Sequence, residues 1–406
     1  MSQQPFPVRM INTVGKLLST VSIPDLTLDP DQLCEIAIKR TGLSDFGDPA
    51  FQEGYRCLIE SADNDANLNF LGRMTIRTML IDSLKNRLLL MGDRKRRPEV
   101  YEKPLLPPII VTGLPRSGTT FLHRLLAVDP SSRALPFWEL MRPLPYSEPD
   151  RRYEEIKNLT NLRFKMTNSG LDRKHFIRAD TPEECIFLMT PTFVSKFFWV
   201  TIPATGYAKW YAAADRYQSY REYSWFLQAL QDVESARRLL LKAPAHLGSL
   251  DALIAAVPDA MLIQLYRDPV PATTSLFSLY TSSHSLSTEN FDVHSMVQNT
   301  LGILEKDVQR NLEFRADNPD RIYDVHYTDL ISNPLDVVQQ VYGHFDVPWT
   351  DELEAGLQDH IAQNPQGKHG VHQYRTDDFG ITEEELTRKF REYIEAFARS
   401  TDKSPV

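Results

Sequence analysis

The sequence is poor in cysteine, contains no long apolar run and has no excess of basic charge. Its 406 residues include only three cysteines, Cys34, Cys57 and Cys185, which are odd in number, scattered and without CxxC spacing. This pattern argues against a disulfide framework and a structural zinc site, and it fits a reducing compartment. We expect the three side chains to be buried as small apolar groups.

Targeting and membrane-spanning segments are also missing. The first residues, MSQQPFPVRMINTV, lack the uninterrupted apolar stretch of a signal peptide. The most apolar region, residues 253–265, contains Asp259 and Gln264 and is interrupted by Pro258, so it does not predict a membrane span. We therefore expect a cytoplasmic protein without a transmembrane segment.

Acidic side chains outnumber basic ones, 54 against 45, for a net charge of −9. Because affinity for phosphate backbones comes from clustered Lys and Arg, this balance disfavours a nucleic-acid partner. The one basic run, Arg94 to Arg97, is short, and we interpret it as a solvated linker. The length leaves room for one elaborated domain or two, with ample apolar core.

The organisation of the chain changes near residue 104. Residues 1–104 are predicted to be mainly helical, with Asp29 as a candidate N-cap and with helical spacing of apolar residues in 68–91. A proline cluster at 104–108 cannot continue a helix. We predict a helical N-terminal extension over residues 1–104, packed on the core, and an α/β domain over 105–406.

Apolar strands alternate with helices beyond residue 105. The predicted strands are residues 109–112, 239–242, 261–266 and 322–327, each followed by a helical pattern or a helix-start signal. Such alternation is typical of a parallel sheet covered on both faces. The predicted fold class is α/β, a three-layer P-loop-type fold with a central parallel sheet flanked by helices. Thr382 and Glu385 predict a capping box at the start of the last helix, 382–398.

The most informative segment is the turn after the first predicted strand, residues 113–120, with the sequence GLPRSGTT. Backbone N–H groups in such a turn, together with the positive end of the next helix, form a cradle for an oxyanion. Gly113 and Gly118 permit close approach of the backbone. The other candidate ligands of the loop are its proline, its cation and its hydroxyl residues: Pro115, Arg116, Ser117, Thr119 and Thr120.

The loop departs from the pattern of ATP-using enzymes. Its spacing is close to GxxxxGK[ST], but Thr119 stands where an ATPase or kinase has its lysine. Asp268 is the one acidic residue that follows a second strand as a candidate Mg²⁺ ligand. The loop therefore favours a different phosphate donor. A P-loop kinase or nucleotide hydrolase that uses Mg·ATP stays open as the alternative function, and a tight turn without a ligand is the structural interpretation.

GLPRSGTT resembles the 5′-phosphosulfate loop of sulfotransferases, which carry PKSGTT or PRSGTT and use 3′-phosphoadenosine 5′-phosphosulfate (PAPS) as donor. Residues 265–275 resemble the 3′-phosphate element of this family, a strand ending in arginine with a serine eight positions later. Here these residues are Arg267 and Ser275, which can converge on one phosphate through charge-assisted hydrogen bonds. Taken alone, Arg267 would equally fit a turn with a surface ion pair.

Weaker resemblances extend the similarity over residues 105–380. Residues 327–334, YTDLISNP, are similar to the Y-x-D-L-x-x-x-P segment of the family, which implies a nucleotide contact for Tyr327. Residues 367–375 depart from the RKGxxG of the cytosolic enzymes, and the basic loop implied there would supply Lys368. The segments TPEE, KAPAHL and DDFGI, at 181–184, 242–247 and 377–381, look closest to a bacterial-type branch.

The resemblance implies sulfuryl transfer to a hydroxyl, which needs charge stabilisation, a base and in-line positioning. It implies a charge role for Arg116 in the loop and for Lys242, which matches the lysine of the family's K-x-H-L-P. A lysine that snorkels from the sheet edge to solvent is the structural interpretation of Lys242. No metal is expected.

Two residues compete for the role of base. The histidine of K-x-H-L-P is replaced by Pro244, and the nearest histidine, His246, would orient substrate or cap its helix. Glu139 resembles the glutamate that acts as base in the tyrosylprotein and trehalose-type members. Enclosure by Phe137 and Trp138 would raise the pKa of Glu139. We favour Glu139, with an exposed glutamate at a helix start as the alternative.

Acidic residues near position 180 lie close to a histidine and are therefore candidate metal ligands. His175, Asp180, Glu183 and Glu184 match no metal-binding spacing. The TPEE segment at 181–184 indicates first a helix N-cap with proline and acids in the first turn. A contact with substrate is the second interpretation.

Aromatic residues concentrate in residues 193–226, where they make up 12 of 34 positions and include three of the five tryptophans. A helical insertion around 186–230 with an ordinary aromatic core explains this enrichment. A pocket for an apolar alcohol, phenol, sterol-like or polyprenoid acceptor, or a face that meets lipid, explains it equally. A carbohydrate acceptor also stacks on aromatic rings.

The sequence thus predicts a PAPS-dependent sulfotransferase that acts on a hydroxyl of a small, hydrophobic acceptor, with lipid-like and phenolic molecules as candidates. A catalytically silent nucleotide-binding member is the alternative from another class. No motif of the sequence indicates the identity of the acceptor or the formation of a homo-oligomer.

Overall fold

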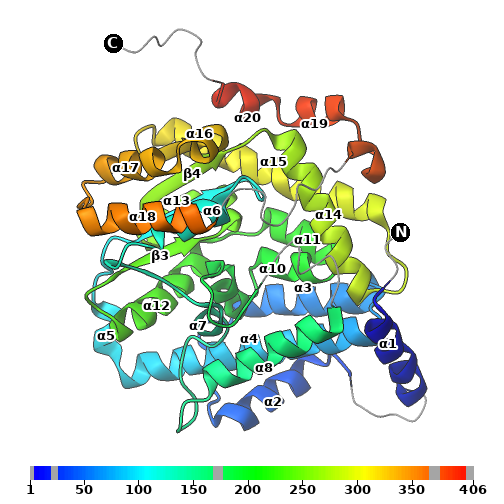
Figure 1. Cartoon of the computed structure of the whole chain (residues 1–406). Helices are drawn as coiled ribbons and strands as arrows, with labels where there is room; N and C mark the ends of the chain where they lie inside the picture. The colour runs from blue at the N-terminus through cyan, green and yellow to red at the C-terminus, as the bar shows by residue number, and fades with distance from the viewer. Residues whose placement is uncertain (1–3, 20–25, 168–176, 365–374, 399–406) are drawn as a thin grey trace.

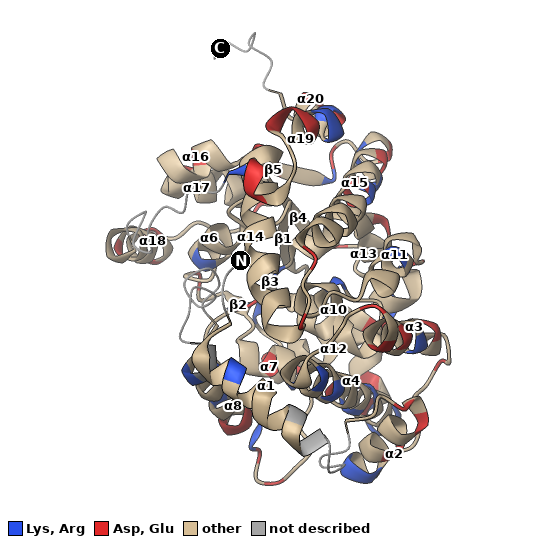
Figure 2. Ribbon diagram, turned by 90° about the vertical axis from the view of Figure 1, so that its right-hand side faces the viewer, with Lys and Arg blue, Asp and Glu red and all other residues tan. Residues whose placement is uncertain are grey.

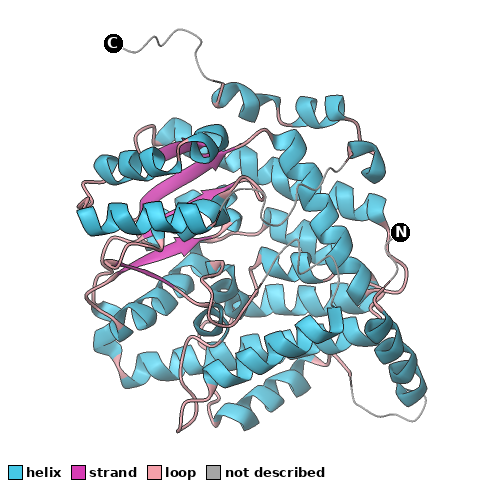
Figure 3. Ribbon diagram, viewed as in Figure 1, coloured by secondary structure: helices cyan, strands magenta, loops and turns pink. Residues whose placement is uncertain are grey.

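The protein is described here by a computed structural model that covers residues 4–19, 26–167, 177–364 and 375–398. Within these ranges, five parallel strands form one sheet in the order β2-β3-β1-β4-β5. Helices lie on both sides of the sheet, as Figure 3 shows. The predicted α/β fold with a central parallel sheet is confirmed.

The strands agree with the sequence patterns. Their bounds are β1, Ile109–Gly113; β2, Ser132–Ala134; β3, Arg238–Lys242; β4, Met261–Tyr266; and β5, Ile322–His326. Four of them match the predicted strands to within one residue. Strand β2 was not predicted, because Ser-Arg-Ala offers no run of apolar or β-branched residues.

Helices precede, connect and follow the strands (Figure 1). Before the sheet come α1, Phe6–Ser19; α2, Pro30–Thr41; α3, Phe51–Asn64; α4, Phe70–Arg96; and α5, Pro98–Glu102. Between β1 and β3 lie α6, Thr119–Leu126; α7, Phe137–Met141; α8, Arg152–Thr167; the 3₁₀ helix η1, Cys185–Thr192; α10, Lys196–Thr201; α11, Thr205–Ala213; and α12, Tyr217–Val233.

The remaining helices follow β3. They are the 3₁₀ helix η2, Pro244–Ser249; α13, Leu250–Ala256; α14, Pro269–Ser287; α15, Val293–Asp317; α16, Tyr327–Ser332; α17, Pro334–His344; and α18, Asp351–Gln363. The C-terminal part contains the 3₁₀ helix η3, Thr376–Phe379, with α19, Glu383–Lys389, and α20, Arg391–Ala396.

Strand β1 is central and pairs with β3 on one side and β4 on the other. Val111 lies opposite Lys242, and Gly113 lies opposite Leu265. Parallel strands end at the same edge of a sheet, and ligands of open α/β sheets bind at that edge. The register therefore brings the segments that follow β1, β3 and β4 together at one edge.

Alternating side chains of the strands supply two apolar layers. Ile109 and Val111 belong to a buried cluster with α6, α17 and α18. Ile110 lies on the other face, in a cluster with α12 and α13. Burial on both faces explains why the strands are continuously apolar.

The N-terminal helices join a third apolar cluster, which also contains side chains of α10, α11, α14 and α15. The buried guanidinium of Arg87, in α4, donates to Glu222 of α12 at 2.9 Å and to the carbonyl oxygens of Phe46 and Pro191. The predicted division at residue 104 and the bounds 186–230 of the aromatic insertion stay predictions.

Several local predictions need correction. Arg94 to Arg97 do not form a linker: they end α4, and both Arg96 and Arg97 pair with Asp93. The predicted last helix is interrupted at Phe390, although its capping box is confirmed. Only Cys185 is fully buried among the cysteines. In the described part of the chain, no helix has the length and apolarity needed to cross a bilayer.

Removing the carboxylate that pairs with Arg87 should destabilise the protein strongly. Glu222→Leu leaves the guanidinium buried without a counter-charge, which costs about 3–5 kcal/mol. Denaturant unfolding measures this free energy. The matched control is Lys389→Met, which breaks the half-exposed pair with Glu305 and should cost less than about 1 kcal/mol. Equal losses in the two variants would contradict the account.

Candidate functional site

The loop between β1 and α6 requires glycine at two positions. Gly113 and Gly118 have φ of 145° and 99°, in the region that favours glycine. A Cβ at Gly113 would lie 2.5 Å from the carbonyl oxygen of Leu265, and one at Gly118 would lie 2.9 Å from the ring of Tyr327. The loop therefore packs closely against β4 and the start of α16.

Four predicted donor-binding residues meet at this loop. Arg116 donates from Nε to Ser275 Oγ at 3.2 Å, and its carbonyl oxygen accepts from Arg267 Nη1 at 2.7 Å. The guanidinium of Arg267 lies 4.3 Å from the ring centre of Tyr327. Arg116 has a φ of 68°, a conformation that costs a non-glycine residue about 1–3 kcal/mol and is concentrated at functional sites.

Polar groups of the loop suit an oxyanion. The hydroxyl oxygen of Ser117 is buried and has no hydrogen-bond partner. Thr119 and Thr120 begin α6, and the first N–H groups of a helix lack intrahelical acceptors. An orphaned hydroxyl, helix N–H groups and two nearby guanidinium groups fit a phosphorylated nucleotide. Pro115 is half-buried in the same loop, whereas Lys368 lies outside the described residues.

Lys242 joins this loop to a pair of acids. Its side chain is 1% exposed, so it does not snorkel to solvent. Nζ donates to Glu184 Oε1 at 2.9 Å and to Thr120 Oγ1 at 3.3 Å, and it lies 3.8 Å from Glu183 Oε1. A buried ammonium next to the first turn of α6 can stabilise negative charge that develops there.

The acids of the TPEE segment are therefore part of this site. The N-cap interpretation is wrong for Thr181, whose hydroxyl donates to the carbonyl oxygen of Arg178. Pro182 instead pairs with Pro136 in an isolated bridge. The contact between Glu184 and Lys242 was missed by sequence reasoning. Two adjacent acids, Glu183 and Glu184, together with a lysine at the end of an apolar strand, are the sequence pattern from which this contact could have been inferred.

Glu139 lies in a different environment. Both its carboxylate oxygens accept from Arg133 Nη2, at 2.8 and 2.7 Å, within a buried ion pair. Burial raises the pKa of Glu139, although the charge of Arg133 opposes this. The side-chain contacts described for Glu139 go to Arg133 and not to the loop or Lys242. Its role as base stays a prediction.

His246 is buried and neutral at pH 7. Its Nδ1 lies 2.7 Å from the hydroxyl of Tyr220, and its Nε2 lies 3.2 Å from Sγ of Cys185. Burial lowers the pKa of His246 to about 4. Because both ring nitrogens face side chains, the interpretation as a helix cap is wrong. Cys185 directly follows Glu184, which connects His246 to the acids beside Lys242.

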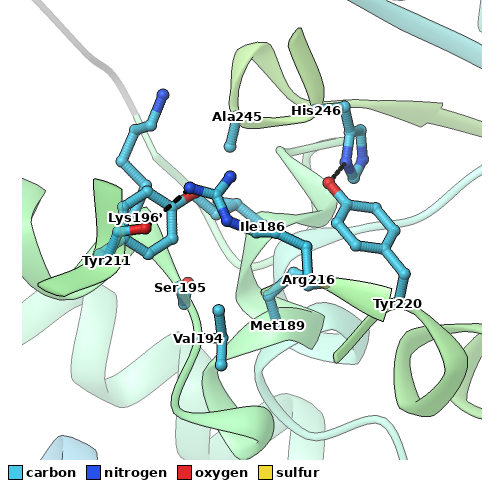
Figure 4. A pocket seen from close by; sticks show the side chains of 10 residues that line it. All are labelled: Ile186, Met189, Val194, Ser195, Lys196, Tyr211, Arg216, Tyr220, Ala245 and His246. Carbon is cyan, nitrogen blue, oxygen red and sulfur yellow. Dashed lines mark hydrogen bonds between the residues drawn. The ribbon is translucent and has the colours of Figure 1, made fainter. Parts of the chain in front are cut away.

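A small cavity lies next to these residues (Figure 4). Its volume is about 10 Å³, room for one water-sized group. It is lined by Ile186, Met189, Val194, Ser195, Lys196, Tyr211, Arg216, Tyr220, Ala245 and His246. Arg216, drawn at the centre of Figure 4, donates to Ser249 Oγ at 2.7 Å and to the carbonyl oxygen of Tyr211 at 2.8 Å.

The aromatic segment serves mainly as core. Eight of its rings are at most 3% exposed: Phe193, Phe198, Trp199, Tyr207, Tyr211, Tyr220, Tyr223 and Phe226. Two of these, Tyr211 and Tyr220, also line the cavity. The segment therefore forms mainly apolar core, as in the structural interpretation, and two of its tyrosines also form part of the cavity wall.

The candidate metal ligands do not assemble in the described residues. No group of three His, Cys, Asp or Glu side chains there is placed to hold a metal ion. Asp268 accepts from the backbone N–H of Val270 at 2.9 Å and caps α14. His175 lies outside the described residues.

Comparisons with known proteins give a matching family and several similar proteins. The family model described as "Sulfotransferase family" matches residues 107–351. Sulfotransferase STF9 from Mycobacterium avium is similar in structure, with a TM-score of 0.84 and 28% identity, over 94% of this chain and 100% of that one. For sulfotransferase STF1 from Mycobacterium tuberculosis the TM-score is 0.79 and the identity 29%, over 91% and 100%. Omega-hydroxy-beta-dihydromenaquinone-9 sulfotransferase Stf3 from Mycobacterium bovis is 24% identical over 299 residues, 68% of this chain and 72% of that protein.

The buried state of His246 predicts a loss of stability in mild acid. The unfolded chain binds a proton near pH 6.5, but the folded chain binds it only near pH 4. Burial of the neutral imidazole therefore lowers the free energy of unfolding only below pH 6.5. Between pH 6.5 and 4 this free energy falls by up to about 1.4 kcal/mol per pH unit. Unfolding free energies measured between pH 6.5 and 5 should fall less steeply for His246→Gln than for the wild type.

The exposed His294 provides the control for this experiment. His294→Gln should leave the pH dependence of the wild type unchanged. The assignment fails if His246→Gln and the wild type lose stability with the same slope over this interval.

Proposed function

The chain belongs to the sulfotransferase family, and from this premise we propose that it transfers a sulfuryl group from PAPS to a hydroxyl of a hydrophobic, lipid-like acceptor. Family membership makes sulfuryl transfer the activity of the chain. The donor, the acceptor and the residue roles are proposals that the geometry of the site supports.

One observation carries the proposal for the donor: the two predicted phosphate elements touch. Arg116 in the loop donates to Ser275, and Arg267 donates to the backbone of Arg116. PAPS has anionic groups at both its 3′ and 5′ positions, so its binding site needs cations and N–H donors at two neighbouring points. Mg·ATP would need a lysine at the position of Thr119, which this loop lacks.

In this proposal the phosphate groups are divided between the two elements. The hydroxyl of Ser117 and the N–H groups of Thr119 and Thr120 hold the 5′ end, while Arg267 and Ser275 hold the 3′-phosphate. When bound, PAPS supplies an activated sulfuryl group. Tyr327 supports the guanidinium of Arg267 from one side.

Lys242 and Glu184 are the proposed chemical centre. Lys242 contacts Thr120 in the loop, so its ammonium can stabilise charge on the transferring group. Glu184 accepts from Lys242, which orients its carboxylate, and its side chain is 24% exposed. A partly exposed, oriented carboxylate can take the proton of an acceptor hydroxyl.

The rival bases are less well placed for this task. Glu139 is 6% exposed, against 24% for the side chain of Glu184, and both its oxygens accept from Arg133. His246 is 1% exposed, and both its ring nitrogens lie beside other side chains, those of Tyr220 and Cys185. We therefore propose Glu184 as the base, with Glu139 as the rival.

The proposed acceptor class rests on a relative and on the cavity. The name of the Mycobacterium bovis relative gives it a hydroxylated dihydromenaquinone as acceptor. In this chain the cavity beside His246 has room for one hydroxyl-sized group, and its lining combines apolar side chains such as Ile186 with polar ones such as Tyr220. An apolar alcohol whose hydroxyl end alone enters the interior fits both observations.

Arg267→Ala should weaken binding at the 3′-phosphate selectively. Affinity for adenosine 3′,5′-bisphosphate, measured by calorimetry, should fall by about 2–4 kcal/mol, on the order of 30- to 1000-fold. Affinity for adenosine 5′-phosphate should change little. The control Arg73→Ala removes a guanidinium paired with Asp63, and should bind as the wild type does. An unchanged affinity of Arg267→Ala for the bisphosphate would refute the assignment.

Glu184→Gln should abolish turnover and leave nucleotide binding intact. Loss of a general base costs about 10²–10⁴-fold in kcat, measured with radiolabelled PAPS and a panel of apolar alcohols and phenols. Glu139→Gln is the matched variant, and it should retain turnover. The reverse pattern, with activity lost only in Glu139→Gln, would transfer the role to Glu139.

A further inference from the structure

Exposed apolar side chains concentrate on two helices, α1 and α8. Among the described residues, twelve large apolar side chains are exposed, and α1 and α8 hold eight of them: Phe6, Met10, Val14, Leu17, Tyr153, Leu159, Leu162 and Phe164. These helices contribute only 14 and 16 residues to the chain. Single apolar residues scatter over any surface, but such a concentration marks an interaction site.

Helix α1 is amphipathic with its apolar stripe turned outward. Phe6, Met10 and Val14 follow one another at intervals of four residues and are 68%, 54% and 48% exposed. The opposite side of the helix holds the buried Val8 and Gly15, and a Cβ at Gly15 would overlap the ring of Phe70 in α4. The helix is thus held to the body of the protein by one side and presents apolar side chains on the other.

Helix α8 extends this surface. It packs against α1, and Figure 1 shows it running across the front of α4 to meet α1. Leu159, Leu162 and Phe164 in its second half are 46%, 55% and 51% exposed. Exposed apolar side chains therefore lie on two helices that contact each other.

Basic residues outnumber acidic ones on these two helices. Helix α1 contains Arg9 and Lys16 and no acidic residue, and Figure 2 draws it without red. Helix α8 contains four basic residues, Arg152, Lys157, Arg163 and Lys165, and two acidic residues, Glu154 and Glu155, of which Glu154 pairs with Lys157. Six basic and two acidic residues on these two helices contrast with a net charge of −9 for the chain. Apolar side chains flanked by Lys and Arg are typical of helices that lie in an anionic lipid interface.

We infer that α1 and α8 form a docking surface for a bilayer containing anionic phospholipid. The inference rests on the proposed function in one respect, since an apolar acceptor alcohol would reside in such a bilayer. A second copy of this chain fits the surface less well. A twofold interface would bring the basic residues of the two copies together, and like charges in contact are costly.

The docking surface is linked to the proposed chemical centre. Helix α8 packs against α7, and the N–H groups of Phe137 and Trp138 in α7 donate to the carbonyl oxygens of Thr181 and Ala179 at 3.0 Å. Glu184 follows three residues after Thr181. A bilayer contact at α8 would therefore involve a helix that packs, through α7, on the segment that carries the proposed base.

Vesicle flotation of the full chain tests the inference without requiring activity. The protein should float with vesicles of phosphatidylcholine and phosphatidylglycerol, and less with phosphatidylcholine alone or in high salt. The double variant Met10→Glu/Leu162→Glu should bind the anionic vesicles at least about tenfold more weakly. Val233→Glu, which changes an equally exposed side chain on α12, should float as the wild type does.

Two flotation results and one sedimentation result would overturn the inference. If the wild type does not float, or if the double variant floats equally well, α1 and α8 do not bind the membrane. A dimer in sedimentation that the double variant abolishes would assign the surface to a second copy. Adenosine 3′,5′-bisphosphate binding and thermal melting are measured on the same samples. If the wild type does not bind adenosine 3′,5′-bisphosphate, the proposed function is refuted, and the flotation result still tests the docking surface.

Discussion

The parallel pairing of β1 with both β3 and β4 is the constraint on which the site depends. It places Gly113, Lys242 and the segment before Arg267 at one edge of the sheet, although they are far apart in the sequence. The loop after β1 can then contact the strand end and helix after β4, and it does so through Arg116 and Ser275. A small change in this register would separate the two proposed phosphate sites.

The burial of Lys242 explains the position of the TPEE segment. A buried ammonium needs an acid nearby, because its desolvation costs several kcal/mol unless it is paired. Glu184 and Glu183 meet this need and draw residues 181–184 to the end of β3. The same electrostatic requirement that stabilises the fold thus holds a carboxylate beside the oxyanion loop.

The strands and the loop could be predicted from the sequence because their patterns are local. Residues 109–120 contain an apolar strand, a glycine turn and a helix start in one continuous stretch, and Arg267 and Ser275 lie on a similarly compact segment. The contact between Glu184 and Lys242 could not be predicted, since it joins residues 58 positions apart. Glu139 was favoured for its resemblance to a family residue, but its pairing with Arg133 depends on tertiary burial. Strand β2 has no apolar pattern and exists through its pairing with β3.

The most direct test of the account is calorimetric titration of the wild-type protein with adenosine 3′,5′-bisphosphate in EDTA, beside adenosine 5′-phosphate and Mg·ATP. The two contacting phosphate elements predict metal-independent binding of the bisphosphate, with much weaker binding of adenosine 5′-phosphate. A preference for Mg·ATP, or equal binding of the two adenosine phosphates, would contradict the account.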